Sequence, residues 1–136
     1  MIKPIQFKTT HRASFQEIDS YGHLNTLHYV SYFLSHRFTA LRERFELDMK
    51  SISELEIAFY TKNLEVAFIR PILGDQLFAI NSLVSEKGDG DCKVSCEMLD
   101  SKDRTLAKCV MHLVCIDKNT GKPTKWPEGF MDRFYE

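Results

Sequence analysis

The fold is decided where the chain reads Asp19-Ser20-Tyr21-Gly22-His23-Leu24-Asn25-Thr26-Leu27-His28-Tyr29. The first seven residues are rich in turn formers, and Asn25 is a good N-cap for a following helix. Apolar residues then recur at steps of three and four, which predicts a helix from about Thr26 to about Phe45. The predicted apolar stripe consists of Leu27, Val30, Leu34, Phe38, Leu41 and Phe45, widened by Tyr29, Tyr32 and Phe33. We therefore expect the first half of this helix to be enclosed on most sides.

Polar and apolar residues alternate on both sides of this helix, with the period of two that is typical of strands. We predict strands over residues 5–18, from about residue 56 to 70, and over 76–86, 92–99 and 104–116, with a short helix in the tail. The alternation changes phase near Thr61-Lys62-Asn63, which indicates either a β-bulge or a short loop. The predicted fold class is α+β, with a largely antiparallel sheet and one long helix.

Length, charge and cysteine content limit the classes of protein. The chain has 136 residues and a net charge of −1, so we expect one domain over residues 1–136 and no nucleic-acid partner. No apolar run suits a membrane span, and the first residues lack the apolar core of a signal peptide, so we expect a cytoplasmic protein with no membrane partner. Four cysteines without a CxxC pair predict buried, reduced thiols. The histidine spacing predicts no metal site.

The last predicted strand is apolar on both faces. Ala107, Cys109, Met111, Leu113 and Cys115 share one parity, and Leu106, Val110, Val114 and Ile116 share the other. One helix covers only one face of a sheet, so the second face needs the tail or another copy of the chain. We therefore expect a homo-oligomer.

Asp19 stands six residues before the predicted N-cap. Unpaired N–H groups at a helix start carry partial positive charge and stabilise an oxyanion, while a nearby carboxylate activates water or attacks a carbonyl. The same placement also suits an aspartate that only caps a loop.

The pattern Asp-x-x-Gly-His-Leu-Asn-x-x-x-Tyr over residues 19–29 resembles the 4-hydroxybenzoyl-CoA thioesterase branch of the hotdog-fold superfamily. Phe15-Gln16-Glu17-Ile18, residues 68–75, Gly121-Lys122-Pro123 and Trp126-Pro127-Glu128 extend the resemblance over nearly the whole chain. It implies a hotdog fold, a curved antiparallel sheet wrapped around one central helix. It also implies a homodimer or homotetramer whose protomers join their sheets, with active sites at the interface.

The resemblance implies that Asp19 is the catalytic general base or nucleophile. Thr26, or a neighbouring backbone N–H, would form the oxyanion hole. Gly22 suits a tight loop backbone, and His23 and Asn25 are expected to hold the loop and cap the helix more than to contact substrate. Tyr21 and His28 are expected either in the acyl pocket or in the core or interface. Glu65 is a candidate across the interface; Arg70, Lys87, Lys93 and Arg104 are candidates for contacts with coenzyme A phosphates.

The expected function is hydrolysis of an acyl-CoA thioester, with no metal and no bound cofactor. An acyl-carrier-protein thioesterase and a non-catalytic acyl-thioester-binding protein remain alternatives. The chain carries Thr26 where the family often has a second Asn. No Asp or Glu occurs from Thr26 to Arg42, so the helix cannot supply the catalytic carboxylate of a second hotdog branch. His23 and His28 do not reproduce the order found in hotdog dehydratases.

Overall fold

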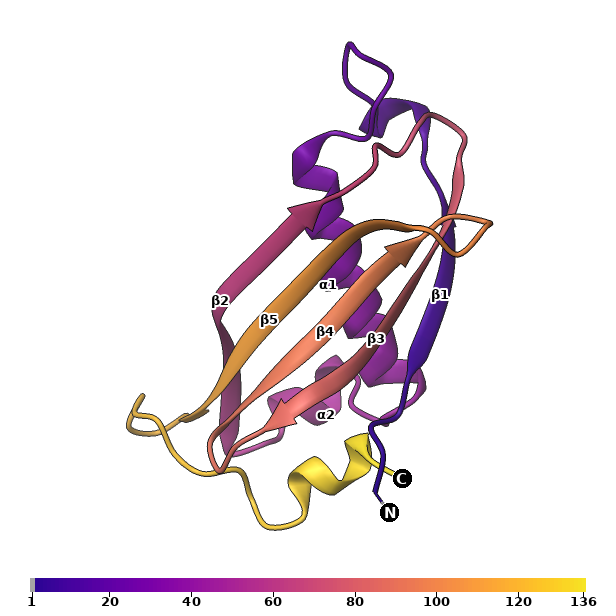
Figure 1. Cartoon of the computed structure of the whole chain (residues 1–136). Coiled ribbons are helices and arrows are strands. Elements are labelled where there is room, and N and C mark those ends of the chain that lie inside the picture. Colours follow the sequence, from indigo (N-terminus) through magenta and orange to yellow (C-terminus); the bar gives the residue numbers. More distant parts are fainter. Residues whose placement is uncertain (1) are drawn as a thin grey trace.

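The computed structural model describes residues 2–136 and shows a curved five-stranded sheet packed around one long helix (Figure 1). The elements in chain order are β1 (Phe7–Arg12), the 3₁₀ turn η1 (Phe15–Glu17), α1 (Thr26–Glu43), α2 (Met49–Ser53), β2 (Ile57–Phe68), β3 (Leu77–Lys87), β4 (Asp91–Leu99), β5 (Thr105–Asp117) and the 3₁₀ turn η2 (Phe130–Phe134). The sheet order is β1-β3-β4-β5-β2, and all neighbours are antiparallel. The predicted α+β hotdog fold is confirmed.

The three central strands form a meander, because short turns join β3 to β4 and β4 to β5. β2 adds beside β5 and β1 adds beside β3, so β1 and β2 are the two edges of the sheet. β2 is 12 residues long and β1 only 6. The longer edge therefore leaves the larger row of backbone groups without a partner strand.

The predicted change of phase in β2 is a β-bulge. The register against β5 shifts between Thr61 and Asn63, so that Phe59 pairs with Cys115 and Leu64 pairs with Met111. The extra residue brings apolar side chains of opposite parity onto the same face of the sheet. The bulge is thus confirmed, and the alternative of a short loop is wrong.

The helix face that packs on the sheet differs from the predicted stripe. The buried residues of α1 are Tyr29, Phe33, His36, Arg37, Ala40 and Leu41. Leu27 and Phe38 of the predicted stripe are 78% and 51% exposed, and the first turn is not enclosed in the single chain. The pattern missed this because polar residues at the centre of the buried face are satisfied by the sheet: His36 Nε2 and Arg37 Nη1 are both hydrogen-bonded to Ser82 Oγ, at 2.7 and 2.9 Å.

Two boundaries near the helix also differ from prediction. The first strand ends at Arg12 rather than Ile18, because Ser14 and Glu17 form a reciprocal capping box that turns the chain into η1. The predicted long helix ends at Glu43, and the short α2 that follows was not predicted. Asp48 caps α2 by accepting a 2.8 Å hydrogen bond from the Ser51 backbone N–H.

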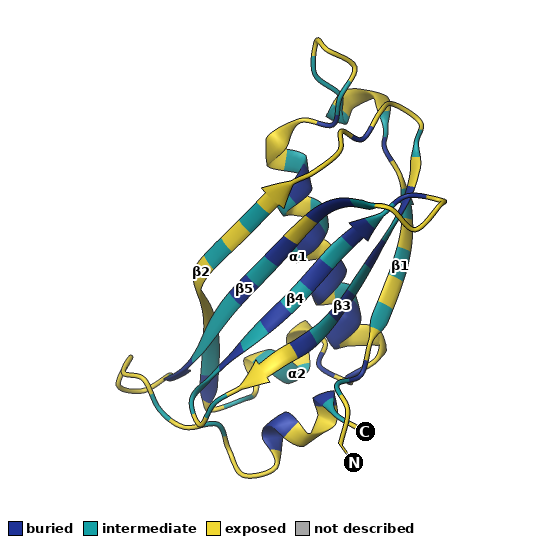
Figure 2. Cartoon of the chain, viewed as in Figure 1, coloured by how far each residue is buried: buried dark blue, intermediate teal, exposed yellow. Residues whose placement is uncertain are grey.

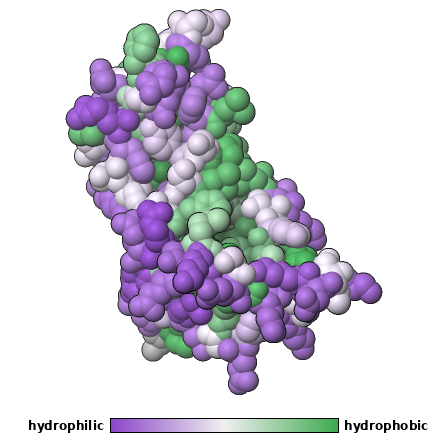
Figure 3. Space-filling model, turned by 180° about the vertical axis from the view of Figure 1, so that it is seen from behind, coloured by the Kyte–Doolittle hydropathy of each residue, from purple (hydrophilic) through white to green (hydrophobic). Residues whose placement is uncertain are grey.

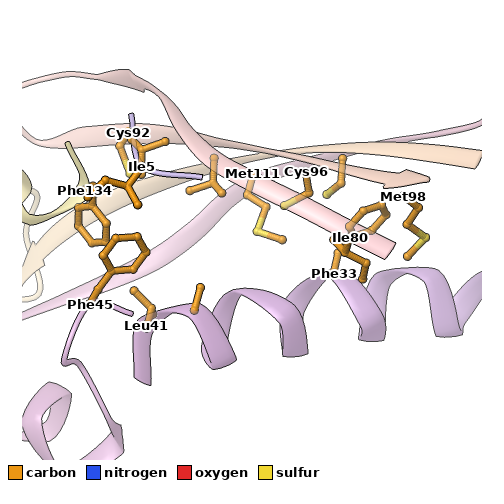
Figure 4. Close-up of a cluster of buried hydrophobic side chains, with 14 of the residues drawn as sticks. Ile5, Phe33, Leu41, Phe45, Ile80, Cys92, Cys96, Met98, Met111 and Phe134 are labelled. Atoms are coloured by element: carbon orange, nitrogen blue, oxygen red, sulfur yellow. The ribbon is translucent and has the colours of Figure 1, made fainter. Parts of the chain in front are cut away.

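The core lies between α1 and the concave face of the sheet. Phe33 and Leu41 on α1 face Ile80, Met98 and Met111 on the strands (Figure 4). Dark blue buried residues recur along the central strands β3, β4 and β5 in Figure 2. All four cysteines are buried and free, as predicted. Within residues 2–136, no helix is both long enough and apolar enough to cross a membrane.

The tail closes one end of this core. Phe130, Met131 and Phe134 of η2 are buried, and the Phe134 ring lies 4.8 Å from that of Phe45. The two ends of the chain lie together (Figure 1), joined by a 2.7 Å bond from the Lys3 N–H to the Glu136 carbonyl. The predicted short helix in the tail is thus present as a 3₁₀ turn.

Candidate active site

The Asp19 carboxylate organises the loop that leads into α1. Its Oδ1 accepts hydrogen bonds from the backbone N–H groups of Tyr21, at 2.9 Å, and His23, at 3.2 Å. Gly22 closes the loop with a φ of 79°, a conformation that glycine adopts at low cost. Within residues 2–136, Oδ2 accepts no hydrogen bond. One oxygen thus holds the loop while the other stays available to a ligand.

The start of α1 presents one unused backbone donor. Asn25 caps the helix as predicted, accepting a 3.0 Å bond from the Leu27 N–H. The His28 N–H donates to the Asn25 carbonyl at 2.9 Å. Among the residues described, no acceptor engages the Thr26 N–H. This donor lies at the positive end of the helix dipole, where a developing negative charge is stabilised.

Asp19 and Thr26 line the same cavity, which has a volume of about 340 Å³. The other lining residues are His23, Leu24, Tyr29, Phe68, Ile69, Arg70 and Pro71. The loop, the first turn of α1 and the end of β2 therefore form the three walls. The first two are neighbours in sequence, while the third depends on the pairing of β2 with β5.

Tyr29 and Phe68 were not among the predicted site residues. Tyr29 is buried, and its hydroxyl accepts a 3.3 Å hydrogen bond from the Ile72 N–H. Burial raises the pKa of Tyr29, so its hydroxyl stays protonated. The Tyr29 and Phe68 rings meet edge to face at 5.0 Å. A tyrosine four residues after an N-cap, and the aromatic residue closing a strand, were the available sequence signals.

Several predicted residues lie away from this cavity in the single chain. Tyr21 is 83% exposed at the loop tip, and His28 is half-buried on the first turn of α1; neither lines the cavity. Glu65 is exposed and pairs with Val110, on the opposite face of β2 from Leu64 and Val66. The described residues of one chain therefore do not bring Glu65 to Asp19.

One of the four candidate cations lies at the cavity. Arg70 is exposed there, and its Nη1 donates a 2.6 Å hydrogen bond to the Thr105 carbonyl. Lys93 is ion-paired with Glu86, and Arg104 is ion-paired with Asp100. Lys87 lies over the Tyr135 ring, at the end of the sheet near the tail. Of the four candidate cations, Arg70 alone lines the Asp19 cavity in the described residues.

The sequence matches a known family, and the fold matches those of solved structures. A family model described as the thioesterase-like superfamily matches residues 13–134. A search of curated proteins gave no match. Among solved structures, the probable thioesterase YbaW from Escherichia coli has 20% identity and a TM-score of 0.83, covering 93% of this chain and 94% of that one.

Two further structures share the fold. Slr0204, a 1,4-dihydroxy-2-naphthoyl-CoA thioesterase from Synechocystis, has 15% identity and a TM-score of 0.84, covering 95% of both chains. SAV2348 from Staphylococcus aureus, in complex with CoA, has 13% identity and a TM-score of 0.86, covering 96% of this chain and 82% of that one. The architecture is thus that of the hotdog thioesterases. The chain belongs to the thioesterase-like superfamily, which places it among the thioester hydrolases as a class.

Proposed function

We propose that this protein hydrolyses acyl-CoA thioesters to a free acid and coenzyme A, with Asp19 as the catalytic carboxylate. The observation that carries the proposal is the shared cavity of Asp19 and the Thr26 N–H at the start of α1. A carboxylate and an oxyanion donor facing one space are the two groups that hydrolysis of a thioester requires. Thioesterases of similar fold support a thioester as the bond that is broken, and the one named for a CoA substrate supports coenzyme A as the carrier.

As general base, Asp19 takes a proton from water while the water oxygen bonds to the thioester carbon. The carbonyl oxygen becomes an oxyanion that accepts a hydrogen bond from the Thr26 N–H. The tetrahedral intermediate then collapses, the carbon–sulfur bond breaks, and the proton passes from Asp19 to the departing thiolate. As nucleophile, Asp19 instead attacks the thioester carbon, the carbon–sulfur bond breaks, and coenzyme A leaves as its thiolate, which takes a proton from water. Water then hydrolyses the mixed anhydride that remains, which releases the acid and restores the Asp19 carboxylate. Either course uses the free Oδ2 and leaves Oδ1 on its loop.

Arg70 is proposed to meet a phosphate of coenzyme A. It lies at the cavity, is exposed, and uses one guanidinium nitrogen to anchor on the Thr105 carbonyl. The remaining N–H groups are free to form charge-assisted bonds with an anion. His23, a lining residue, and Gly22, in the loop, are proposed to shape the backbone around Asp19 rather than to react.

We propose a homodimer or homotetramer as the working unit. Exposed apolar side chains lie at the start of α1, at Leu27, and along β2, at Tyr60 and Phe68. Tyr60 and Phe68 belong to the edge strand β2, Phe68 lines the Asp19 cavity, and Leu27 directly follows Thr26, which also lines that cavity. A second copy on this side would cover them, and it would give Tyr21, His28 and Glu65 a place beside the site. Sedimentation equilibrium tests this, and a monomer at assay concentrations would contradict it.

The decisive experiment measures thiol release from a panel of acyl-CoA substrates by the wild type and Asp19→Asn. Asparagine keeps the Oδ1 acceptor for the loop but loses the charge, so the fold should survive while kcat falls by about 10²–10⁴. Asp117 supplies a matched control, because its Oδ1 also accepts two backbone N–H bonds in a turn far along the chain. Asp117→Asn should retain full activity.

Unchanged activity of Asp19→Asn would overturn the assignment. Replacing coenzyme A with acyl carrier protein in the same assay distinguishes the two carriers. Single-turnover hydrolysis in H₂¹⁸O tests the nucleophilic role of Asp19, because label in its carboxylate would show that water attacked an anhydride at the Asp19 carbon. Tight acyl-CoA binding without turnover would indicate a binding protein instead.

A further inference from the structure

A second cavity lies at the other end of α1. It has a volume of about 430 Å³, within the roughly 300–1,000 Å³ of small-molecule pockets. α1, α2, the first half of β2, the inner face of the sheet and the tail all contribute to its lining. A hydrophobic hollow is visible on the side of the molecule turned away in Figure 1 (Figure 3). This cavity shares no lining residue with the Asp19 cavity.

Arg37 lines this cavity and is only 7% exposed. Its Nη1 donates to Ser82 Oγ at 2.9 Å, and its guanidinium lies 5.4 Å from the centre of the Phe45 ring. Among residues 2–136, no other acceptor engages its remaining N–H groups, and no carboxylate lies within 4.0 Å. A buried guanidinium without a counter-ion is costly, so an anionic ligand there would be strongly stabilised.

Among residues 2–136, no neighbouring group supplies the missing negative charge. Burial raises the pKa of the Cys92 and Cys96 thiols to about 11 and about 12, so both are neutral. Burial likewise lowers the pKa of His36 to about 4, so that neighbour is neutral above this pH. Neither Asp nor Glu lines the cavity, whereas a second cation, Lys118, stands in its wall. The charge pattern therefore selects an anion.

The rest of the lining selects an aliphatic chain. Leu34, Leu41, Ile52, Phe59, Met111 and Trp126 surround the space beside Arg37. Phe38 and Met49, which also line it, are exposed and so mark the side that opens to solvent. An apolar chain laid between these residues is removed from water, at about 0.8 kcal/mol per buried CH₂. A single charged head group would then meet Arg37 at the inner end.

We infer that this cavity binds the carboxylate of an aliphatic fatty acid, with its head group on Arg37 and its chain extending toward Phe38 and Met49. The site is separate from Asp19: Arg37 lies on the order of 18 Å along α1 from the N-cap Asn25, at 1.5 Å per residue. The acid is either released by the proposed hydrolysis or taken up from elsewhere, and binding does not depend on the proposed function.

Trp126 provides a direct readout. It is the one tryptophan of the chain, it lines the cavity, and its ring stacks on Phe130 at 5.6 Å. Titration of the wild type with decanoate and with 1-decanol, followed by Trp126 fluorescence, compares two ligands with the same chain and different heads. Decanoate should bind about ten- to a hundredfold more tightly, the range expected for a charge-assisted bond to a buried cation. Equal affinity for the two ligands would show that the cavity binds only the apolar chain, and it would overturn the proposal.

Two matched variants assign the head group to one cation. Arg37→Met should remove the preference for the acid while still binding the alcohol. This variant is expected to fold, because an apolar side chain of similar volume replaces an unpaired buried charge and Ser82 keeps its bond to His36. Lys118→Met should keep the preference, because Lys118 already donates to the Ser53 carbonyl at 2.9 Å. The reverse result would overturn the placement on Arg37.

Two further comparisons separate this site from the proposed catalytic one. Asp19→Asn should bind decanoate as tightly as the wild type, whether or not it has lost hydrolysis. If Asp19→Asn abolishes decanoate binding, the acid occupies the other cavity and the proposal is wrong. Trp126 fluorescence is followed during decanoyl-CoA hydrolysis, with and without added decanoic acid. It shows whether the acid formed by hydrolysis fills the site or whether only acid added to the solution does so.

Discussion

The Tyr32 hydroxyl donates a 2.6 Å hydrogen bond to Glu17 Oε1. The same Oε1 accepts the Ser14 N–H at 2.9 Å, and the Asn25 N–H donates to the Glu17 carbonyl, also at 2.9 Å. Glu17 therefore links η1, the Asp19 loop and the first half of α1. Burial by itself would raise the pKa of Glu17, but the hydrogen bonds from Tyr32 and Ser14 outweigh it and lower the pKa below its ordinary 4.5.

Tyr32→Phe removes this hydrogen bond and should lower the free energy of unfolding by roughly 1–2 kcal/mol. Because the folded pKa of Glu17 lies below the unfolded one, its contribution is present above pH 4.5 and is lost as the pH falls through the folded value. The difference between wild type and variant, measured by urea unfolding at several pH values, should therefore shrink in acid. Tyr60→Phe, at an exposed tyrosine on β2, is the control. A difference that persists undiminished at low pH would contradict this account.

His36 should make stability fall as the solution is acidified. It is buried and bonded to Thr9 Oγ1 and Ser82 Oγ, and burial lowers its pKa to about 4, with Arg37 and His11 adding to the effect. The unfolded chain, with a pKa near 6.5, binds more protons between these values, so stability declines from about pH 6.5 toward pH 4. The slope is at most about 1.4 kcal/mol per pH unit from this residue.

His36→Gln tests this dependence by urea unfolding between pH 4.5 and 7.5. The variant is less stable near neutral pH but should show a shallower slope. Burial lowers the pKa of His11 as well, so that a residual slope is expected, and His11→Gln in the same background should remove it. An unchanged slope in the double variant would show that other groups govern the acid response.

Local patterns predicted the parts of this fold that depend on neighbours in sequence. The Asn25 cap, the inward row of Cys92 and Cys96, and the β-bulge are all visible in residue order. The buried face of the helix was predicted wrongly because of tertiary hydrogen bonds. His36 and Arg37 count as polar in sequence, yet both are buried and hydrogen-bonded to Ser82. The cavity at Arg37 could not be predicted from the sequence either, because its walls come from segments that are distant in the chain.

The candidate site also contains one part that the sequence predicts and one part that it does not. Asp19, Gly22, Asn25 and Thr26 belong to one continuous loop and helix start, which a motif can describe. The opposite wall, at Phe68 and Arg70, reaches the loop only through the sheet pairing. Lys87 and Lys93 were predicted as phosphate contacts, but tertiary contacts hold them elsewhere. Lys87 lies over the Tyr135 ring and Lys93 pairs with Glu86, and the sequence alone does not reveal these contacts.

Gly22→Ala should weaken catalysis through the loop backbone. Gly22 has a φ of 79° and no atom near enough to contact an added Cβ, so the penalty comes from the left-handed conformation alone, about 1 kcal/mol. Gly121 offers a matched control, with a φ of 70° and equally open surroundings. Both alanine variants should lose similar stability in thermal unfolding, but only Gly22→Ala should lower kcat for thioester hydrolysis. Equal kcat values in the two variants would separate the loop conformation from the chemistry.

Deletion of Lys62 should destabilise the protein far more than its replacement. Without the extra residue of the bulge, either Ile57 and Phe59 or Leu64 and Val66 must turn away from the core. Exposing such apolar side chains costs at least about 2 kcal/mol, and it moves Phe68, which carries the contact with Tyr29 at the candidate site. Lys62 itself is exposed, so Lys62→Ala should change stability by less than about 0.5 kcal/mol. Urea unfolding and thiol release, measured on both variants, check this expectation. A deletion variant as stable and active as Lys62→Ala would show that the bulge does not align the two halves of β2.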